Sequence, residues 1–337
     1  MARLRRVDST DPGIRRLRCG RGFRYVDETG RTLADADELE RLRALAIPPA
    51  WTEVWICPDP LGHVQATGHD DAGRKQYLYH ERWRRRRERE KFDQALAFAR
   101  ELPAIRRRVR RDLRRRGLVR ERVLGCGIRL LDLGLFRVGG EEYAEQNGTY
   151  GLATLRRRHL RFERGRAVFA YPAKGGERLV QEIADPLVLP TLRALARRRG
   201  APRRLFAYRN GREWHEVRAD RLNDHLKLIG GGAFSAKDFR TWNATVLMAV
   251  KLAAREPQPG SKTARERAIR EAVAEVAEHL GNTPAVCRRS YVDPRVIDRF
   301  RAGETIEASL RGLAAAEEGG TAAGRTRIEA AVLELIG

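Results

Sequence analysis

The sequence contains few residues that could build a disulfide framework or a metal centre. Among its 337 residues are only four cysteines and seven histidines. The cysteines, at positions 19, 57, 126 and 287, show no paired spacing, and no two histidines have the spacing of metal ligands. We therefore expect neither disulfides nor a bound metal, and we expect a reducing compartment.

Long apolar segments and nucleotide-binding loops are missing as well. The longest apolar run, residues 244–250, includes a threonine and is far too short to span a bilayer. The first residues are rich in arginine and lack the apolar stretch of a signal peptide. No Gly-x-x-x-x-Gly-Lys-Ser/Thr loop occurs. These features predict a cytoplasmic protein with no membrane partner and no cofactor.

Acidic residues are too few to balance the basic ones. Lys and Arg total 68 against 45 Asp and Glu, which gives a formal net charge of +23. Only seven of the 68 are lysine. The surplus of arginine reflects in part a GC-rich coding bias, so the net charge is the stronger evidence. Such an excess favours a nucleic acid or another anionic surface as the partner.

The first segment, residues 20–82, has the pattern of short strands separated by turns. We predict a helix over residues 35–45 and strands over residues 23–26, 54–57, 63–67 and 73–80. In the last strand the side chains alternate between two faces, with Lys75, Tyr77 and Tyr79 on one and Arg74, Gln76 and Leu78 on the other. These residue types suit phosphate and base-edge contacts, although an ordinary amphipathic strand has the same periodicity.

An arginine-dense helical run follows over residues 80–117. The length of the chain suggests about two domains, and the change of composition predicts a boundary near the start of this run. We therefore predict domains over residues 1–88 and 89–337. Most of the arginines in the run suit a solvated helix face, but together they would attract a phosphate backbone.

A largely apolar helix is predicted over residues 123–136, and its end presents Arg137, followed by Gly139 and Gly140. A charged side chain at the end of a buried helix, beside glycines that let a backbone approach closely, fits anion binding. Residues 159–183 then predict a three-stranded meander with Lys174 in its second turn.

Further helices are predicted over residues 191–199, 217–228, 235–245 and 263–280. Lys237 and Arg240 are three residues apart, so in a helix both cations can point at one phosphate. The closing helices, over residues 296–313 and 326–336, show no recognisable chemistry.

The segment over residues 278–292 contains a tyrosine with a possible chemical role. Gly281 can end one helix, Thr283 can cap the next and Pro284 suits its first position, which places Tyr291 on a short helix after a tight turn. With cations nearby to stabilise the phenolate, Tyr291 is a candidate nucleophile for phosphorus. Read alone, the segment is equally an ordinary helical hairpin.

Five segments, in order, resemble the type IB DNA topoisomerases of bacteria and poxviruses. They are Ile47-Pro48-Pro49-Ala50-Trp51 with Gly73-Arg74-Lys75-Gln76-Tyr77-Leu78-Tyr79; Arg137-Val138-Gly139-Gly140; the hairpin with Lys174; Lys237-Asp238-Phe239-Arg240-Thr241; and Gly281-Asn282-Thr283-Pro284 with Tyr291. The resemblance covers residues 20–300 approximately.

The resemblance implies an α+β fold that forms a clamp around double-stranded DNA. A small β-rich N-terminal DNA-binding domain is joined to a mainly α-helical catalytic domain with a three-stranded sheet. It implies a 3′-phosphotyrosyl intermediate on Tyr291 and relaxation of supercoils without ATP or metal. The other catalytic residues would be Arg137, Arg240, Asn282 and the general acid Lys174, and the DNA contacts Arg74, Gln76, Tyr77, Tyr79 and Lys237.

The chain departs from the viral and nuclear enzymes at one catalytic position, where Asn282 replaces a histidine. An amide can donate a hydrogen bond to a phosphate oxygen but cannot be a cation, so its stabilisation of the transition state is expected to be weaker. Two alternatives stay open. A site-specific tyrosine recombinase usually has a histidine where Lys237 stands, and a DNA-binding protein without activity could retain the fold. We expect a monomer in the cytoplasm, associated with the nucleoid.

Overall fold

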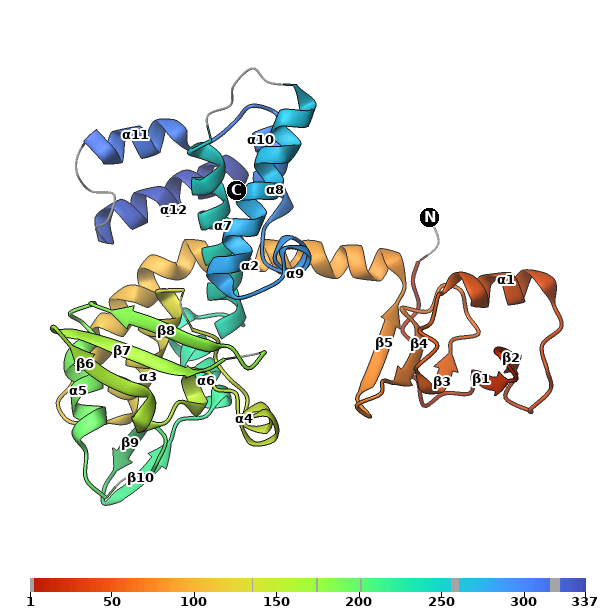
Figure 1. Ribbon diagram of the computed structural model, residues 1–337, viewed down its shortest axis with the longest axis horizontal. Helices are drawn as coiled ribbons and strands as arrows, with labels where there is room; N and C mark the ends of the chain where they lie inside the picture. Colours follow the sequence, from red (N-terminus) through yellow and green to blue (C-terminus); the bar gives the residue numbers. More distant parts are fainter. Residues whose placement is uncertain (1–2, 135, 174, 201, 256–260, 316–321) are drawn as a thin grey trace. The chain divides into compact units, whose positions relative to one another are not determined.

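The computed structural model describes residues 3–134, 136–173, 175–200, 202–255, 261–315 and 322–337. The chain divides into two compact units, Met1–Lys91 and Phe92–Gly337 (Figure 1). The first is rich in β-strands and the second is mainly helical with a three-stranded sheet. The predicted mixture of helices and strands is therefore confirmed.

Unit 1 is built on an antiparallel sheet in the strand order β2-β1-β3-β4-β5. Its elements are β1 (Ile14–Cys19), β2 (Gly22–Val26), α1 (Ala36–Ala44), β3 (Thr52–Ile56), β4 (Val64–His69) and β5 (Lys75–Tyr79). The side chain of Asp35 caps α1 by accepting a hydrogen bond from the backbone N–H of Glu38. Leu42 of α1 is buried with Ile14, Val54 and Ile56 in the core of this unit.

Strand β1 was not predicted from the sequence. Its six residues include three arginines, which hide the alternation of apolar and polar side chains. Arg16 nevertheless points inward and is buried, because its guanidinium donates hydrogen bonds to the backbone carbonyls of Ile47, Pro48 and Trp51 at 2.8–2.9 Å. A buried arginine that is bonded to backbone carbonyls looks the same in the sequence as an exposed one.

Helix α2 (Glu81–Leu113) is the predicted arginine-dense helix and begins in unit 1. From Leu96 onward its buried apolar residues belong to the large core of unit 2. The other helices of unit 2 are α3 (Arg120–Asp132), α4 (Glu141–Asn147), α5 (Leu189–Arg197), α6 (Ala219–Gly230), α7 (Ala236–Ala253), α8 (Lys262–Leu280), α9 (Pro284–Ser290), α10 (Pro294–Arg301), α11 (Glu307–Ala315) and α12 (Ala322–Ile336), with 3₁₀ turns at Leu152–Thr154 and Arg157–His159.

The predicted meander is present as β6 (Leu160–Glu163), β7 (Arg166–Pro172) and β8 (Arg178–Ile183), paired in the order β6-β7-β8. Figure 1 shows it beside α3 and α5. A second hairpin, β9 (Ala207–Asn210) with β10 (Glu213–Glu216), was not predicted. Its strands are only four residues long, although Asn210-Gly211, where β9 ends and the turn begins, is a hairpin signal.

Several predicted helix boundaries were wrong. The closing helix predicted over residues 296–313 is two helices, α10 and α11, separated by a turn in which Gly303 has a φ of +85°. Helix α3 ends at Asp132, whereas the apolar pattern extended it to residue 136. Gly134 adopts a φ of +83°, which ends the helix, and a β-carbon at this position would lie only 3.0 Å from the side chain of Asn243. Arg137 is therefore presented by a connecting segment after the helix rather than by the helix end itself.

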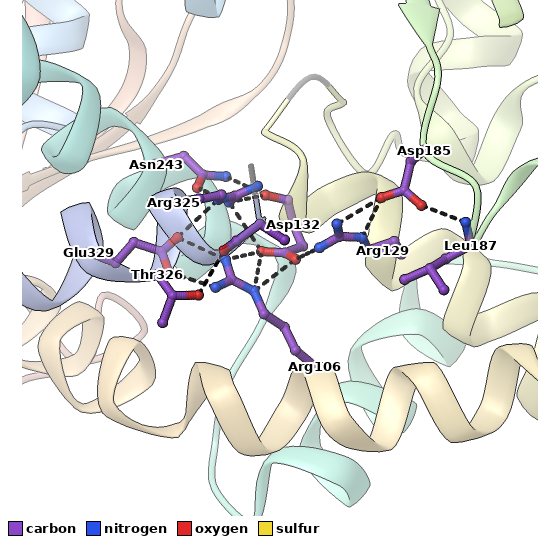
Figure 2. A network of polar contacts seen from close by, with 10 residues as sticks. Arg106, Arg129, Asp132, Asp185, Leu187, Asn243, Arg325, Thr326 and Glu329 are labelled. Atoms are coloured by element: carbon purple, nitrogen blue, oxygen red, sulfur yellow. Dashed lines mark hydrogen bonds and ion pairs between the residues drawn. The ribbon is translucent and has the colours of Figure 1, made fainter. Parts of the chain in front are cut away.

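A buried network of charges joins α12 to the rest of unit 2 (Figure 2). At its centre is Asp132, whose side chain is only 3% exposed and pairs with Arg106, Arg129 and Arg325. Arg106 also binds Glu329 of α12 at 2.6 Å, and Arg325 donates to Asn243 of α7 at 3.0 Å. The last closing helix, α12, in which no chemistry was expected, thus contributes Arg325 and Glu329 to this network. The network links α2, α3, α7 and α12.

No helix within the described ranges combines the length and apolarity needed to cross a membrane.

Candidate functional site

The turn before Tyr291 has the predicted structure. Gly281 ends α8 in the left-handed conformation with a φ of 59°, and the side chain of Thr283 accepts a hydrogen bond from the N–H of Val286 at the start of α9. Tyr291 itself is the residue that closes α9, with its backbone N–H bonded to the carbonyl of Cys287 at 3.0 Å. Its side chain is partly buried against the core of unit 2.

Arg137 lies over the end of α8. One of its guanidinium nitrogens, Nη2, donates to the carbonyl of Gly281 at 2.6 Å, to that of Leu280 at 3.3 Å and to the side-chain oxygen of Asn282 at 2.8 Å. Arg137 and Asn282, which lie far apart in the sequence and were predicted as site residues from separate motifs, are therefore in direct contact.

The backbone around Arg137 is held by a close approach of two glycines. The carbonyl of Arg137 accepts from the N–H of Leu152 at 2.8 Å, and a β-carbon on Gly139 would lie only 2.7 Å from the Cα of Gly151. The close contact predicted at two glycines is thus made by Gly139 with Gly151, and the space at Gly140 is open. Only glycine fits at both contact positions.

Arg240 comes from the first turns of α7 and lies over the candidate nucleophile. Its guanidinium carbon is 5.0 Å from the centre of the Tyr291 ring, and its Nη2 donates to the carbonyl of Leu280. Burial and the neighbouring guanidinium of Arg137 lower the pKa of Arg240, and Tyr291 opposes this effect. An anion beside the two arginines would relieve their repulsion.

Two donors at this place have no partner of their own. Within the part of the chain that the structure describes, Nε of Arg240 and Nδ2 of Asn282 are buried without a hydrogen bond. An unsatisfied buried donor is costly, and such donors in a native protein call for a ligand or a function. The site therefore has positive charge and free hydrogen-bond donors next to a tyrosine, which together suit a bound phosphate.

The surroundings include residues that the sequence did not single out. Tyr171 on β7 is buried, and burial raises its pKa while Arg137 and Arg240 oppose the rise. Thr245 of α7 donates a hydrogen bond of 3.3 Å to the carbonyl of Tyr291 and so supports the backbone of that residue. Nothing in the local sequence distinguishes these two residues from ordinary members of the core.

Of the two lysines predicted in the site, the structure describes only Lys237. Lys174 lies outside the described residues. Lys237 is exposed on the first turn of α7, whereas Arg240, one turn further, is half-buried over Tyr291. The proposed use of both cations on one phosphate stays a prediction.

The predicted DNA contacts of unit 1 lie on or next to β5, an edge strand of the sheet. Tyr77 and Tyr79 are 46% and 43% exposed, and their rings are stacked with centres 5.9 Å apart. The ammonium group of Lys75 lies 5.6 Å from the ring centre of Tyr77. Arg74 and Gln76 both contact the carboxylate of Asp70, which the sequence did not single out.

Comparison with known proteins identifies the family. The family model described as the catalytic core of eukaryotic DNA topoisomerase I matches residues 80–311, and that of the N-terminal domain of bacterial DNA topoisomerase IB matches residues 22–70. The chain belongs to the type IB DNA topoisomerases. Over 287 residues it is 31% identical to DNA topoisomerase 1B of Acanthamoeba polyphaga mimivirus. The aligned residues cover 83% of this chain and 85% of that protein. This type IB topoisomerase thus has the enzyme class that its motifs predicted.

Proposed function

We propose that Tyr291 is the nucleophile of this topoisomerase. Its hydroxyl oxygen would attack a backbone phosphorus, form a 3′-phosphotyrosyl bond and release the 5′ oxygen of the broken strand as a hydroxyl. The free strand would rotate and the 5′-hydroxyl would then attack the phosphotyrosine, restoring the strand and the tyrosine. Because the covalent bond conserves the energy of the phosphodiester, the cycle requires neither ATP nor a metal ion.

The convergence of donors beside Tyr291 carries this proposal. Arg137 and Arg240 would neutralise the charge that develops on the phosphorane, and Asn282 would donate from Nδ2 to a non-bridging oxygen. If Tyr291 only packed against the core, the two buried donors without partners beside it would cost free energy and serve no purpose. Lys237, exposed one turn before Arg240, would bind the DNA backbone.

Lys174 is the proposed general acid for the departing 5′ oxygen, since a lysine ammonium gives up a proton far more readily than a guanidinium. Replacement of the bridging 5′ oxygen by sulfur gives a leaving thiolate that needs no proton. Lys174→Ala should therefore cleave the ordinary strand slowly and the sulfur-bridged strand at nearly the normal rate, whereas Arg240→Ala should be slow on both. Failure of sulfur to rescue Lys174→Ala would assign the acid elsewhere, with Lys237 the next candidate.

The two domains, proposed as residues 1–88 and 89–337, would close around duplex DNA as a monomeric clamp in the cytoplasm, associated with the nucleoid. Arg74, Gln76, Tyr77 and Tyr79 on or next to the edge strand β5 would contact the duplex. Base-edge contacts determine sequence preference, whereas phosphate contacts determine position and dominate affinity. Gln76, which can both donate and accept, is the proposed base-reading residue.

The decisive experiment is incubation of the protein with supercoiled plasmid in EDTA without ATP. Both positive and negative supercoils should be relaxed, with the linking number changing in variable steps. A strict requirement for Mg²⁺ or ATP would contradict the proposed reaction.

A further inference from the structure

The carboxylate of Asp70 contacts both polar side chains next to the stacked tyrosines. Its Oδ2 accepts a hydrogen bond of 2.9 Å from Nε2 of Gln76 and another of 2.9 Å from Nε of Arg74. Arg74 also approaches this oxygen with Nη2, at 2.7 Å. Asp70 is therefore hydrogen-bonded to the side chain that is proposed to read the bases.

The two oxygens of Asp70 have separate tasks. Oδ1 accepts from the backbone N–H groups of Ala72 and Arg74 at 3.0 and 2.9 Å, and so closes the turn between β4 and β5. Oδ2 is left to the side chains of Arg74 and Gln76. The turn therefore holds Oδ2 at a fixed place under Gln76.

This arrangement permits only one orientation of the Gln76 amide. The hydrogen bonds from the side chain and backbone of Arg74 lower the pKa of Asp70 to about 2. At neutral pH the carboxylate thus has no proton to donate, so the amide must turn its nitrogen toward Asp70. Its oxygen Oε1 and its second amide hydrogen are left for a ligand.

One acceptor and one donor side by side match the major-groove edge of adenine, which offers a donor at N6 and an acceptor at N7. The opposite orientation would present the NH₂ group alone, with two donors that match O6 and N7 of guanine. The direction of the amide therefore decides which purine the side chain prefers.

We propose that Asp70 is a positioning residue for sequence preference, which acts by fixing the amide of Gln76 so that it reads adenine in the major groove. This inference rests on the proposed role of Gln76 in reading DNA. Asp70→Asn tests it sharply. An asparagine keeps an oxygen for the turn but turns an NH₂ group toward both Gln76 and Arg74. The guanidinium of Arg74 can only donate and must move away from this group, whereas Gln76 can rotate its amide to accept from it and then presents two donors.

Unit 1 contains a matched control. Asp27 makes the same turn after β2, at the opposite edge of the sheet, where its Oδ1 accepts from the backbone N–H groups of Thr29 and Arg31 at 2.9 Å each. Both turns end in glycine and arginine, as Asp27-Glu28-Thr29-Gly30-Arg31 and Asp70-Asp71-Ala72-Gly73-Arg74. Asp27→Asn therefore makes the same change of charge in the same kind of turn, away from Gln76.

The experiment selects cleavage sites from a pool of duplexes with random sequence, by capture and sequencing of strands linked to the full-length protein. Asp70→Asn should shift the ratio of adenine to guanine about tenfold toward guanine at one base pair, the size expected for exchange of one two-bond contact. Asp27→Asn should retain the wild-type preference. Gln76→Ala should lose the preference at that base pair, and adding Asp70→Asn to it should change nothing more.

The outcomes separate this inference from the proposed function. If Gln76→Ala changes the preference but Asp70→Asn behaves like Asp27→Asn, Asp70 does not position the amide and only this inference is overturned. If Gln76→Ala leaves the preference unchanged, the reading role of Gln76 is wrong, and the inference is overturned with it.

A second measurement depends on neither cleavage nor the folding of a variant. In the wild-type protein with ¹⁵N-labelled glutamine, one of the two Gln76 side-chain amide protons should exchange with solvent at least about tenfold more slowly than the other, because only one is bonded to Asp70. Equal exchange of the two protons would overturn the inference, whatever the protein does to DNA.

Discussion

Arg137 donates a hydrogen bond of 2.8 Å to the side-chain oxygen of Asn282, which is 145 residues further along the chain. This bond fixes the direction of the amide, because the guanidinium can only donate and must face the oxygen. The nitrogen of Asn282 is then left as a buried donor without a partner among the described residues. Asn282 thus depends on Arg137 to present a donor where a phosphate would bind.

Replacement of Asn282 should separate the two ends of its amide. Asn282→Ala removes the donor that we propose for the transition state and should slow single-turnover cleavage about 100-fold. Asn282→Asp keeps the oxygen that Arg137 binds but places negative charge toward the phosphate, so it should be slower than the alanine variant. An aspartate variant as fast as the wild type would show that Nδ2 does not face the reacting phosphate.

Tyr291→Phe should abolish covalent attachment while leaving the fold and DNA binding intact. The aromatic ring that lies under Arg240 is kept, so the melting temperature should change by no more than about 2 °C and DNA affinity by no more than about threefold. Tyr208→Phe on β9 is the matched control and should retain cleavage. Covalent complexes formed by Tyr291→Phe, detected on denaturing gels, would place the nucleophile elsewhere.

The network around Asp132 should contribute strongly to the stability of unit 2. Arg106→Met would leave two buried carboxylates, Asp132 and Glu329, short of a partner, and should lower the free energy of unfolding by about 3–5 kcal/mol. Arg166→Met removes the exposed pair of Arg166 with Glu182, which also lies in unit 2, and should cost no more than about 0.5 kcal/mol. Urea denaturation measures both, and equal losses would show that the network has no special weight.

The local structure of the site was predictable from the sequence, because its signals lie within a few residues of one another. Gly281, Thr283 and Pro284 each have a backbone preference that acts on the adjacent helix, and the structure confirms all three positions. The end of α3 was misplaced because Gly134 outweighed an apolar pattern that continued past it.

Contacts across the chain left no such signal. The bond from Arg137 to Asn282 and the contact of Gly139 with Gly151 join segments whose sequences are independent of each other. Asp70 appeared to be an ordinary turn residue, since the use of its second oxygen depends on the side chain of Gln76 in the strand that follows. The resemblance to a family supplied the roles of residues, but only the structure shows which polar atoms are already engaged.

His159 should make the stability of unit 2 depend on pH in the mildly acidic range. Burial, together with Arg158 and Arg156, lowers the pKa of His159 to about 4, and its Nδ1 accepts a hydrogen bond of 3.1 Å from the backbone N–H of Arg156. The unfolded chain takes up this proton near pH 6.5, whereas the folded protein does so only near pH 4. Between these values the unfolded state binds more protons, so stability falls as pH falls, by at most about 1.4 kcal/mol per pH unit.

Asparagine can offer an oxygen to the Arg156 N–H but does not titrate, so His159→Asn should flatten this slope in urea denaturation series from pH 7 to pH 4. An unchanged slope in His159→Asn would show that His159 is not the titrating group.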